Sequence, residues 1–389
     1  MTVHPRHSAP IVRGALTVAT ATLAAFVVAA CGTTAGQDRV VSANSAGSHG
    51  AAGCRPVIAY VVSFSSGTVT PVNTVTDRAL RPIRVGRNPD MMAIAPDGRT
   101  AYVTDSGTHL VTPIRIRTNT AGRPITVGRR PIPIVVTPDG TTAYVANEQS
   151  ATVTPIDTAT DRPGPPIKVG RYPVRLAITP DGRTLYVVHE DGVTPISTAT
   201  DRPGRPIRVG RAPLNIVITR NGKTAYVVNT GGVVPIDIAT NRAGPLIRAP
   251  GAFDVAITPD GSTGYVATVG GEVIPFRTAT DTALTPIHVP VGIGPIAITP
   301  NGRTAYIADA VTGQVTPIDL ATGTAESPIS VPRSPGAIAI TPDGSAVYVS
   351  GQHSVTAILT STGTVLPPVR VGSSPVAIAM GPAAPGCRA

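Results

Sequence analysis

Short apolar runs separated by turn residues dominate the chain from residue 58 onward. One copy of the pattern, residues 137–178, reads TPDGTTAYVANEQSATVTPIDTATDRPGPPIKVGRYPVRLAI. Its apolar positions fall into a Tyr-Val stretch, a V-x-P-I stretch, a P-I-x-V stretch and a P-x-x-I-A-I stretch. Runs of this length, bounded by Pro, Gly, Asp and Asn, predict β-strands joined by tight turns.

The same order of strands recurs along the chain, at spacings of 39 to 42 residues between the tyrosines that open each Tyr-Val stretch. These tyrosines are Tyr60, Tyr102, Tyr144, Tyr186, Tyr226, Tyr265, Tyr306 and Tyr348. A period of about 40 residues with four short strands per unit is typical of propeller blades, because a lone sheet leaves both faces bare until its neighbours cover them. The sequence therefore predicts an all-β fold, a β-propeller of eight four-stranded blades. Seven blades and a distorted remnant are the alternative.

The turns fit this interpretation, and one proline does not. Tetrads such as Pro138-Asp139-Gly140 suit a short hairpin, since Pro presets φ and Gly accepts the left-handed residue. A proline such as Pro71 or Pro155 recurs inside the V-x-P-I strand, where a strand with two neighbours should not lose an N–H. A bulge, or a short fourth strand beside it, would reconcile the two observations.

The two ends of the array are complementary. The chain enters at a Tyr-Val strand, residues 58–62, and leaves on an I-A-I strand, residues 375–379. We expect the last strand to be the inner strand of the first blade, so that strand exchange between the termini closes the ring and exposes no open blade.

Composition supports one repetitive domain, residues 54–389, that behaves as a monomer. The chain has no Trp and 3% aromatic residues, so the blades are expected to pack through Val, Ile, Ala and Thr. The 41 Pro and 40 Gly fall in register with the repeat, which indicates turns and not disorder.

The first 30 residues are expected to be a lipoprotein signal peptide. Basic residues precede the apolar run 15–30, which ends Ala29-Ala30-Cys31-Gly32 and resembles a bacterial lipobox. This predicts lipidation (palmitate) of Cys31, a flexible tether over residues 31–53, and an exported protein anchored to the outer side of the cell membrane. A plain signal peptide cut nearby is the alternative. Cleavage lowers the net charge from +10 to +8, because Arg6 and Arg13 are removed.

With Cys31 assigned to lipid, Cys54 and Cys387 remain, and they flank the two ends of the array. Ring closure would bring these ends together, so in an oxidising compartment we expect a disulfide bond between them. Two free thiols are the alternative.

The phrases T-P-D-G, Tyr-Val-x-Asn and P-I-x-V-G-x-x-P resemble the YVTN-repeat β-propeller family. Residues 143–147 and 226–229 match best, and the resemblance covers residues 60–380. The final Asn is replaced in most copies, for example by Asp105 and His189. The family implies a cell-surface or periplasmic propeller, and its likeness to surface-layer and lactonase-like propellers transfers no catalytic residue.

The V-G-R segments are expected on one face of the ring, and they provide a candidate binding face: Arg87, Arg129, Arg171, Arg211 and Arg333. Loops after the Tyr-Val strands are expected beside them, with Asp105, Asn147, Glu148, His189, Glu190, Asp191, Asn229 and Asp309, and a solvated His189. The arginines could bind an anionic partner at the channel mouth, or each could pair with a neighbouring loop and join blade to blade.

Inner strands diverge between copies at their upper ends, which defines a candidate channel mouth: Asp90, Arg175, Asn215 and Asp254. A small polar ligand or a metal could bind there, although drift explains such divergence equally well. Basic residues also recur in the outermost strands, for example Arg84 and Arg208, where charge prevents edge-to-edge association.

Three functions follow from these features. The leading hypothesis is a lipid-anchored, non-enzymatic binding or scaffold module that holds a protein, glycan or other anionic partner on the V-G-R loops. The second is a lactonase-like or other hydrolytic enzyme with its site at the channel mouth. The third is nucleic-acid binding, which the nearby acidic residues disfavour. Motifs for nucleophilic, metal or phosphate chemistry are missing from the sequence, so neither a cofactor nor a metal is expected.

Overall fold

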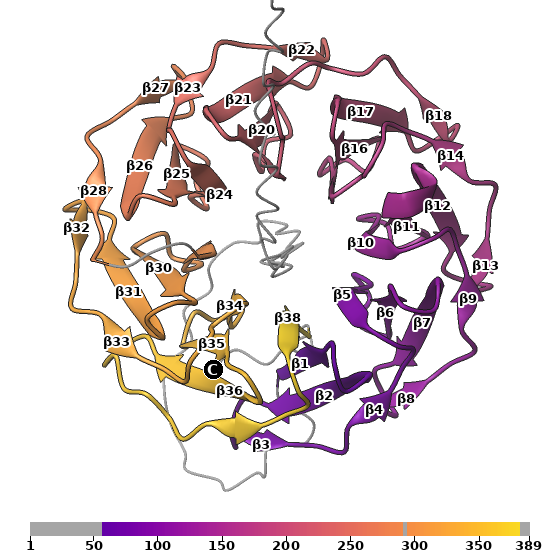
Figure 1. Ribbon diagram of the computed structural model, residues 1–389, viewed down its shortest axis with the longest axis horizontal. Coiled ribbons are helices and arrows are strands. Elements are labelled where there is room, and N and C mark those ends of the chain that lie inside the picture. The colour runs from indigo at the N-terminus through magenta and orange to yellow at the C-terminus, as the bar shows by residue number, and fades with distance from the viewer. Residues whose placement is uncertain (1–56, 291–293, 382–389) are drawn as a thin grey trace, which may run out of the picture.

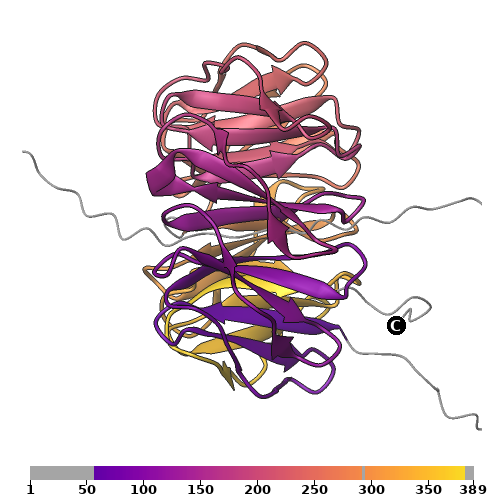
Figure 2. The same ribbon diagram turned by 90° about the vertical axis from the view of Figure 1, so that its right-hand side faces the viewer.

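The computed structural model describes residues 57–290 and 294–381. These residues form eight antiparallel sheets arranged in a ring, so the predicted eight-bladed β-propeller is confirmed (Figure 1). Seen from the side, the ring is a disc whose strands run between its two faces (Figure 2). The predicted signal peptide, tether, lipidated Cys31 and Cys54–Cys387 disulfide lie outside the described residues.

Each blade has an inner, a second, a third and an outer strand. The inner strands are β38 (Pro375–Met380), β5 (Pro89–Ile94), β10 (Pro131–Val136), β15 (Arg175–Ile178), β19 (Asn215–Ile218), β24 (Ala252–Ile257), β29 (Ile296–Ile298) and β34 (Ile338–Ile340). The second strands are β1 (Ile58–Ser63), β6 (Thr100–Asp105), β11 (Thr142–Asn147), β16 (Thr184–His189), β20 (Thr224–Asn229), β25 (Thr263–Thr268), β30 (Thr304–Asp309) and β35 (Ala346–Ser350). The third strands are β2 (Thr68–Asn73), β7 (Leu110–Arg115), β12 (Thr152–Asp157), β17 (Gly192–Ser197), β21 (Gly232–Asp237), β26 (Glu272–Arg277), β31 (Gln314–Asp319) and β36 (Ser354–Leu359).

The outer strand is short, and in most blades it is broken into two pieces. These pieces are β3 (Arg78–Ala79) and β4 (Ile83–Arg84), β8 (Thr120–Ala121) and β9 (Ile125–Thr126), β13 (Arg162–Pro163) and β14 (Ile167–Lys168), β18 (Arg202–Pro203), β22 (Arg242–Ala243) and β23 (Ile247–Arg248), β27 (Thr282–Ala283) and β28 (Ile287–His288), β32 (Thr324–Ala325) and β33 (Ile329–Ser330), and β37 (Val369–Arg370). A single 3-10 turn, η1 (Glu148–Ser150), lies in the described part of the chain.

The broken outer strand explains the recurrent proline. In the first blade Val72 pairs with Ala79 in β3, and Val69 pairs with Ile83 in β4, so the backbone of Pro71 lies between the two pieces. The carbonyl oxygen of Pro71 accepts the N–H of Leu80 at 2.7 Å. Because the outer strand is interrupted beside Pro71, the missing N–H of the proline costs no ladder hydrogen bond. The short fourth strand expected from the sequence is therefore confirmed.

Strand exchange closes the ring, as predicted. The C-terminal strand β38 pairs antiparallel with β1, with Tyr60 opposite Ala379 and Val61 opposite Ile378. Beyond the strands, the N–H of Gly381 donates to the carbonyl oxygen of Ile58 at 2.8 Å. The first and last described segments therefore lie side by side, and the first blade has an inner strand like the other seven.

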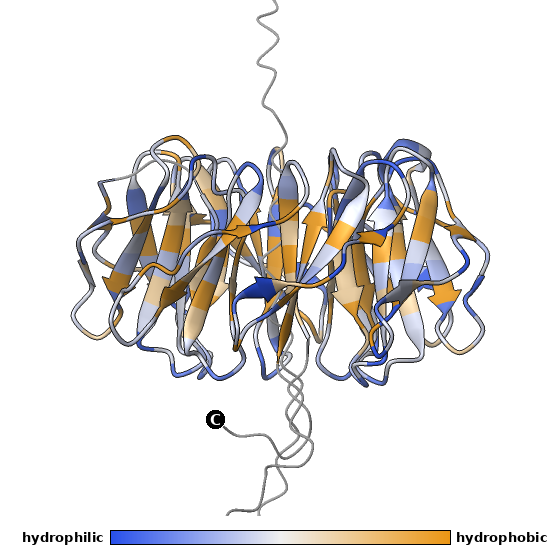
Figure 3. Ribbon diagram, turned by 90° about the horizontal axis from the view of Figure 1, so that it is seen from below, coloured by the Kyte–Doolittle hydropathy of each residue, from blue (hydrophilic) through white to orange (hydrophobic). Residues whose placement is uncertain are grey.

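The apolar core lies between neighbouring blades. A typical cluster joins Tyr144 and Val153 of the third blade to Leu176, Val187 and Ile196 of the fourth. Apolar bands cross the strands in mid-disc and polar residues cover the loops (Figure 3). Six of the eight motif tyrosines are among the largest fully buried side chains, so the few aromatic residues of the chain lie in the interfaces between blades.

Six of the eight buried motif tyrosines also reach the next blade. Each hydroxyl approaches an Asp or Asn in the turn after the third strand, and this acceptor has a left-handed backbone. The pairs and distances are Tyr60–Asn119 3.0 Å, Tyr102–Asp161 3.0 Å, Tyr144–Asp201 2.7 Å, Tyr186–Asn241 2.6 Å, Tyr226–Asp281 2.8 Å and Tyr348–Asp77 2.6 Å. In the two remaining copies Gly323 and Gly363 take the acceptor's place in the repeat, and they offer no side-chain oxygen.

Candidate functional site

The V-G-R segments connect the outer strand of one blade to the inner strand of the next. They meet the hairpins that join the second and third strands: the N–H of Ser106 donates to the carbonyl of Asn88 at 3.0 Å, and that of Glu148 to the carbonyl of Arg130 at 2.9 Å. We call the surface formed by these connections and hairpins the V-G-R face. The five candidate arginines all lie on this face with exposed side chains: Arg87, Arg129, Arg171, Arg211 and Arg333.

Some of these arginines join neighbouring blades, and others do not. The Arg87 guanidinium donates to the carbonyl oxygen of Gly107 at 3.3 Å in the next blade. The Arg171 guanidinium lies 3.4 Å from Glu190 and 3.8 Å from Asp191. Within residues 57–290 and 294–381, the side chains of Arg129, Arg211 and Arg333 make no hydrogen bond or ion pair. Arg87 and Arg171 therefore contact neighbouring loops, as the structural interpretation expects, and the binding of an anion by any member of the set stays a prediction.

The glycine of the V-G-R segment is required by a close contact with the next blade. A Cβ on Gly170 would lie 1.9 Å from Nδ1 of His189, and one on Gly128 would lie 2.6 Å from Cγ of Asn147. Contacts this short are impossible without displacement of the buried side chain. The glycine thus lets the connection lie directly over the end of the neighbouring second strand.

The polar residues at the ends of the second strands are buried, and the prediction that they lie in loops beside the arginines was wrong for Asp105, Asn147, His189, Asn229 and Asp309. Each is the last residue of its strand, beneath a connection from the preceding blade. His189 is fully buried and its Nε2 lies 2.8 Å from Oγ1 of Thr194, so it is not the solvated side chain expected. Glu148, Glu190 and Asp191 do lie in the hairpins.

Burial changes the titration of two of these side chains. Asp105 has no exposed surface, and desolvation raises its pKa to about 7, although a 2.5 Å hydrogen bond from Oγ1 of Thr112 favours the charged form. Desolvation also lowers the pKa of His189, because burial disfavours the imidazolium. A sequence pattern shows the position of such residues in the repeat but not their burial.

Three of the four channel-mouth residues occupy equivalent positions in the inner strands of three successive blades. Arg175, Asn215 and Asp254 each pair with the residue two after the motif tyrosine. Nδ2 of Asn215 donates to Oδ1 of Asp254 at 2.5 Å, and Oδ2 of Asp254 accepts the N–H of Ile296 from a third blade at 3.1 Å. The carboxylate of Asp254 therefore joins three consecutive inner strands.

Asp90 lies elsewhere in the register. In the second blade, Asp90 comes one residue before the position that corresponds to Arg175 of the fourth blade. The pairing between β5 and β6 is irregular at this point. Asp90 and Asp254 are both buried, and each acts on Arg175, whose pKa is lowered by burial and raised by the two carboxylates. Burial raises the pKa of Asp254. These contacts give the channel residues a structural role, and the hydrolytic alternative remains a prediction.

Charge is distributed unequally between the two faces. On the V-G-R face and its rim the basic residues are Arg84, Arg87, Arg129, Arg130, Lys168, Arg171, Arg208, Arg211, Arg248, Arg333 and Arg370. The acidic residues there whose side chains are not buried are Glu148, Glu190, Asp191 and Glu272. Asp90, Asp105, Asp254 and Asp309 lie at the same end of the strands but are buried. The opposite face, formed by the T-P-D-G turns and the turns after the third strands, carries acidic and basic residues in nearly equal numbers. Among the residues that are not buried, basic side chains therefore outnumber acidic ones most clearly on the V-G-R face.

A cavity of about 520 Å³ opens on the V-G-R face between the first two blades. It is lined by the hairpin 64–67, by Arg84 of β4, by the connection 86–88 and by Thr108 of the next blade. The sequence placed Arg84 only on an outer edge, and no pattern in the repeat indicated that it faces a cavity together with Arg87. The two arginines lie three residues apart in one segment of the first blade, whose hairpin 64–67 also lines the cavity, and Thr108 of the second blade borders it.

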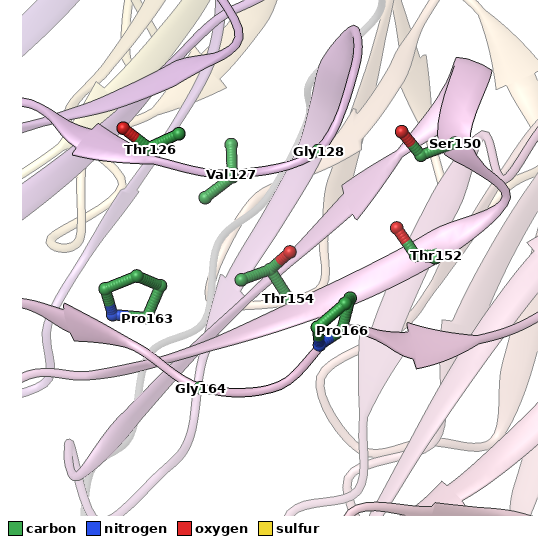
Figure 4. A pocket seen from close by; sticks show the side chains of 9 residues that line it. All are labelled: Thr126, Val127, Gly128, Ser150, Thr152, Thr154, Pro163, Gly164 and Pro166. Atoms are coloured by element: carbon green, nitrogen blue, oxygen red, sulfur yellow. The ribbon is translucent and has the colours of Figure 1, made fainter.

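A smaller cavity of about 330 Å³ lies between the second and third blades. Thr126 and Val127 line it from one blade, and Ser150, Thr154 and Pro166 line it from the other (Figure 4). Its lining residues carry no charge. Among the described residues, neither a group of His, Cys, Asp and Glu that could hold a metal nor a helix able to cross a membrane is found.

Solved structures share the propeller fold at low sequence identity. Hydrazine synthase of Kuenenia stuttgartiensis is 23% identical with a TM-score of 0.56, over 73% of this chain and 96% of that one. The dihydro-heme d1 dehydrogenase NirN in complex with DHE is 13% identical with a TM-score of 0.70, over 81% and 73%. A functionally unknown protein of Desulfotomaculum acetoxidans is 16% identical with a TM-score of 0.57, over 83% and 98%.

No protein-family model matches the sequence, and no curated protein matches it either. Membership of the YVTN-repeat family thus stays a prediction. The neighbours include enzymes and a protein without an assigned activity, and at these identities they establish the fold alone. The chain is a β-propeller, a fold that supports a binding or scaffold role.

Proposed function

We propose that this protein is a lipid-anchored, extracytoplasmic binding module that holds a polyanionic partner on its V-G-R face. The observation that carries the proposal is the unequal charge of the two faces. The V-G-R face presents one arginine at each of five blade connections, and Arg129, Arg211 and Arg333 have side chains without a hydrogen bond or ion pair in the described part of the chain. Guanidinium groups free of acidic partners are suited to carboxylate, sulfate or phosphate groups.

The direction of the chain supports this arrangement. β1 runs from Ile58 to Ser63 and ends at the hairpin 64–67, which belongs to the V-G-R face. Ile58 therefore lies at the opposite face, and Met380 pairs beside it through Ala59. A lipid on Cys31 would be tethered to that opposite face, so an anchored ring would present the V-G-R face away from the membrane.

Nucleic acid is a less suitable partner than a flexible acidic polymer. Glu148, Glu190 and Asp191 interrupt the positive surface, and Arg171 is already paired with two of them. Binding of nucleic acid requires a run of phosphate contacts, and single strands also require aromatic side chains on which bases stack. The face offers few exposed aromatic residues, of which Tyr172 is the most accessible at 52% exposure.

A binding panel with matched charge variants tests the proposal. The mature protein is titrated with dextran sulfate, polygalacturonate, polyphosphate, DNA and neutral dextran by biolayer interferometry at several salt concentrations. One variant carries Arg129→Gln, Arg211→Gln and Arg333→Gln. The matched control carries Arg99→Gln, Arg183→Gln and Arg303→Gln, which removes the same charge from exposed positions of the opposite face.

We expect at least one acidic polymer to bind, the first variant to bind about tenfold more weakly, and the control to bind almost as wild type. Affinity should fall as salt rises. Equal losses in both variants, or no binding of any polyanion beyond that of dextran, would overturn the proposal. Preferential binding of DNA would favour the nucleic-acid alternative.

A further inference from the structure

The cavity between the first two blades differs from the rest of the V-G-R face in its combination of charge, hydroxyl groups and an apolar surface. Arg84 and Arg87 both line it, and no Asp or Glu is among its lining residues. At the equivalent connection two blades later, Arg171 is paired with Glu190 and Asp191. Two guanidinium groups therefore meet one cavity with no carboxylate among its lining residues, and the buried Asp105 lies beneath Gly86 of that lining.

Contacts within the protein orient one of these guanidinium groups. Nη2 of Arg87 donates to the carbonyl oxygen of Gly107 at 3.3 Å, and the other N–H groups of Arg87 remain for a ligand. No hydrogen bond or ion pair engages the Arg84 side chain within the described residues. A planar carboxylate is the group that guanidinium binds with the best geometry, because two parallel N–H bonds match its two oxygens.

The other residues that line the cavity could bind a ring that carries several hydroxyl groups, such as a sugar. Ser65, Ser66 and Thr108 provide hydroxyl groups, and the Ser66 oxygen already accepts the N–H of Ser373 at 2.6 Å, so its own hydrogen is available to donate. The half-buried ring of Phe64 forms an apolar wall. A volume of about 520 Å³ is in the range of small-molecule sites and exceeds what a bare phosphate or sulfate would fill.

We propose that this cavity binds a uronic acid residue of an acidic polysaccharide. The carboxylate of the sugar lies against Arg84 and Arg87, its hydroxyl groups face Ser65, Ser66 and Thr108, and its apolar ring face lies on Phe64. This inference rests on the proposed polyanion-binding function and deepens it, since it names the saccharide and the two blades that hold it. The smaller cavity between the second and third blades lacks charged lining residues, so it serves as an internal comparison.

A short ligand distinguishes binding in this cavity from binding to the V-G-R face as a whole. Trigalacturonate carries the proposed carboxylates but is too short to span several blades, and a neutral trisaccharide of galactose has the same hydroxyl groups without the charge. Isothermal titration calorimetry measures the affinity of the protein for each of the two ligands. Inorganic phosphate and sulfate are titrated separately, because they share the charge but not the ring.

The variants Arg84→Gln and Arg87→Gln remove one guanidinium each. Their matched controls are Arg208→Gln, an exposed arginine at the same place in the repeat of the fourth blade, and Arg171→Gln at another connection. Phe64→Ala tests the apolar wall, and Phe64→Leu keeps an apolar side chain of similar size. Circular dichroism and urea unfolding show that each variant is folded.

We expect trigalacturonate to bind, with losses of about five- to tenfold in Arg84→Gln and in Arg87→Gln, because each charge-assisted pair contributes that much. Arg208→Gln and Arg171→Gln should change the affinity less than twofold, and Phe64→Ala should weaken it more than Phe64→Leu. The inference is overturned if trigalacturonate binds no better than the neutral trisaccharide, if phosphate binds as tightly, or if the controls lose as much as the cavity variants.

The two proposals fail in distinguishable ways. If dextran sulfate or polyphosphate binds the V-G-R face while trigalacturonate does not bind, the face is a polyanion site and the uronate cavity is wrong. If no polymer binds in preference to dextran, the polyanion function itself is wrong.

Discussion

The hydroxyl of Tyr348 donates a 2.6 Å hydrogen bond to Oδ1 of Asp77, which lies 271 residues earlier in the chain. Tyr348 belongs to the last blade and Asp77 to the first, so this contact crosses the seam where the ring closes. It is the same contact that joins other neighbouring blades. The seam therefore uses both an exchanged strand and the repeated tyrosine contact.

Removal of the Tyr348 hydroxyl should loosen the seam. Tyr348→Phe leaves the buried ring in place and removes the donor to Asp77, so we expect a loss of about 1–2 kcal/mol in the free energy of unfolding, measured by urea titration. Tyr306→Phe is the matched control, because Gly363 stands where its acceptor would be and the hydroxyl has no such partner to lose. Equal losses in both variants would show that the contact with Asp77 is not the cause.

Asp105 should make stability depend on pH. Its folded pKa of about 7 lies above the ordinary value, so the folded protein holds this proton more tightly than the unfolded chain. The contribution of Asp105 to stability is therefore fully present below about pH 4 and is lost as the pH rises to about 7. Asn occupies the same place in two other blades, where Asn147 donates to Thr154 at 2.9 Å.

The variant Asp105→Asn tests this dependence. At pH 8 we expect it to be more stable than wild type by about 1–3 kcal/mol, since it removes a buried charge and keeps the shape, and at pH 4 the difference should nearly vanish. Urea titrations across this range measure the difference. Comparison of the two proteins at each pH cancels the opposite effect of His189, whose lowered pKa makes stability fall below about pH 6.5. A difference that does not change with pH would contradict the assignment.

The glycine of the V-G-R segment should not accept a side chain. In Gly170→Ala the new Cβ would lie 1.9 Å from Nδ1 of the buried His189, and the expected loss is about 2–3 kcal/mol or more in the free energy of unfolding. Gly336→Ala is the control, because its Cβ would meet its nearest atoms at 3.8 and 3.9 Å, an ordinary contact distance. Thermal unfolding followed by circular dichroism compares the two, and a stable Gly170→Ala protein would show that the connection can move away.

The proposed disulfide between Cys54 and Cys387 has a direct chemical test. The described parts of the chain bring residues 58 and 381 within hydrogen-bond distance, and the two cysteines follow a few residues beyond. In the mature exported protein we expect no thiol to react with iodoacetamide before reduction and two thiols to react afterwards, as read by mass spectrometry. Reduction should lower stability by about 2–5 kcal/mol. Two reactive thiols in the unreduced protein would refute the bond.

Some features of the ring followed from pattern alone because they depend on neighbouring residues. The tyrosine spacing predicted the blades, the Pro-Asp-Gly turns predicted their hairpins, and the unmatched first and last strands predicted the exchange of β38 onto β1. A repeat makes this inference strong, since each copy must bury the faces of its neighbours in the same way. Pro71 predicted either a bulge or a short outer strand, and the broken pair β3 and β4 shows that the second is correct.

The candidate site depended on contacts that no local pattern encodes. His189 and Asp105 have polar side chains, which favour a loop in any sequence-based reading, yet the connection from the preceding blade covers them completely. Arg84 and Arg87 lie three residues apart in one segment, but the repeat pattern did not show that the hairpin 64–67 and Thr108 of the next blade line a cavity with them.

The amino-acid sequence by itself determined the strand order, the count of eight repeats and the way the ring closes, because periodicity and turn chemistry act over a few residues. The structure decided that the eight repeats form eight blades and not seven with a distorted remnant. The tertiary structure decided which polar groups are buried, which arginines are paired and which residues line a cavity with Arg84 and Arg87, because these depend on contacts between segments that lie apart in the chain.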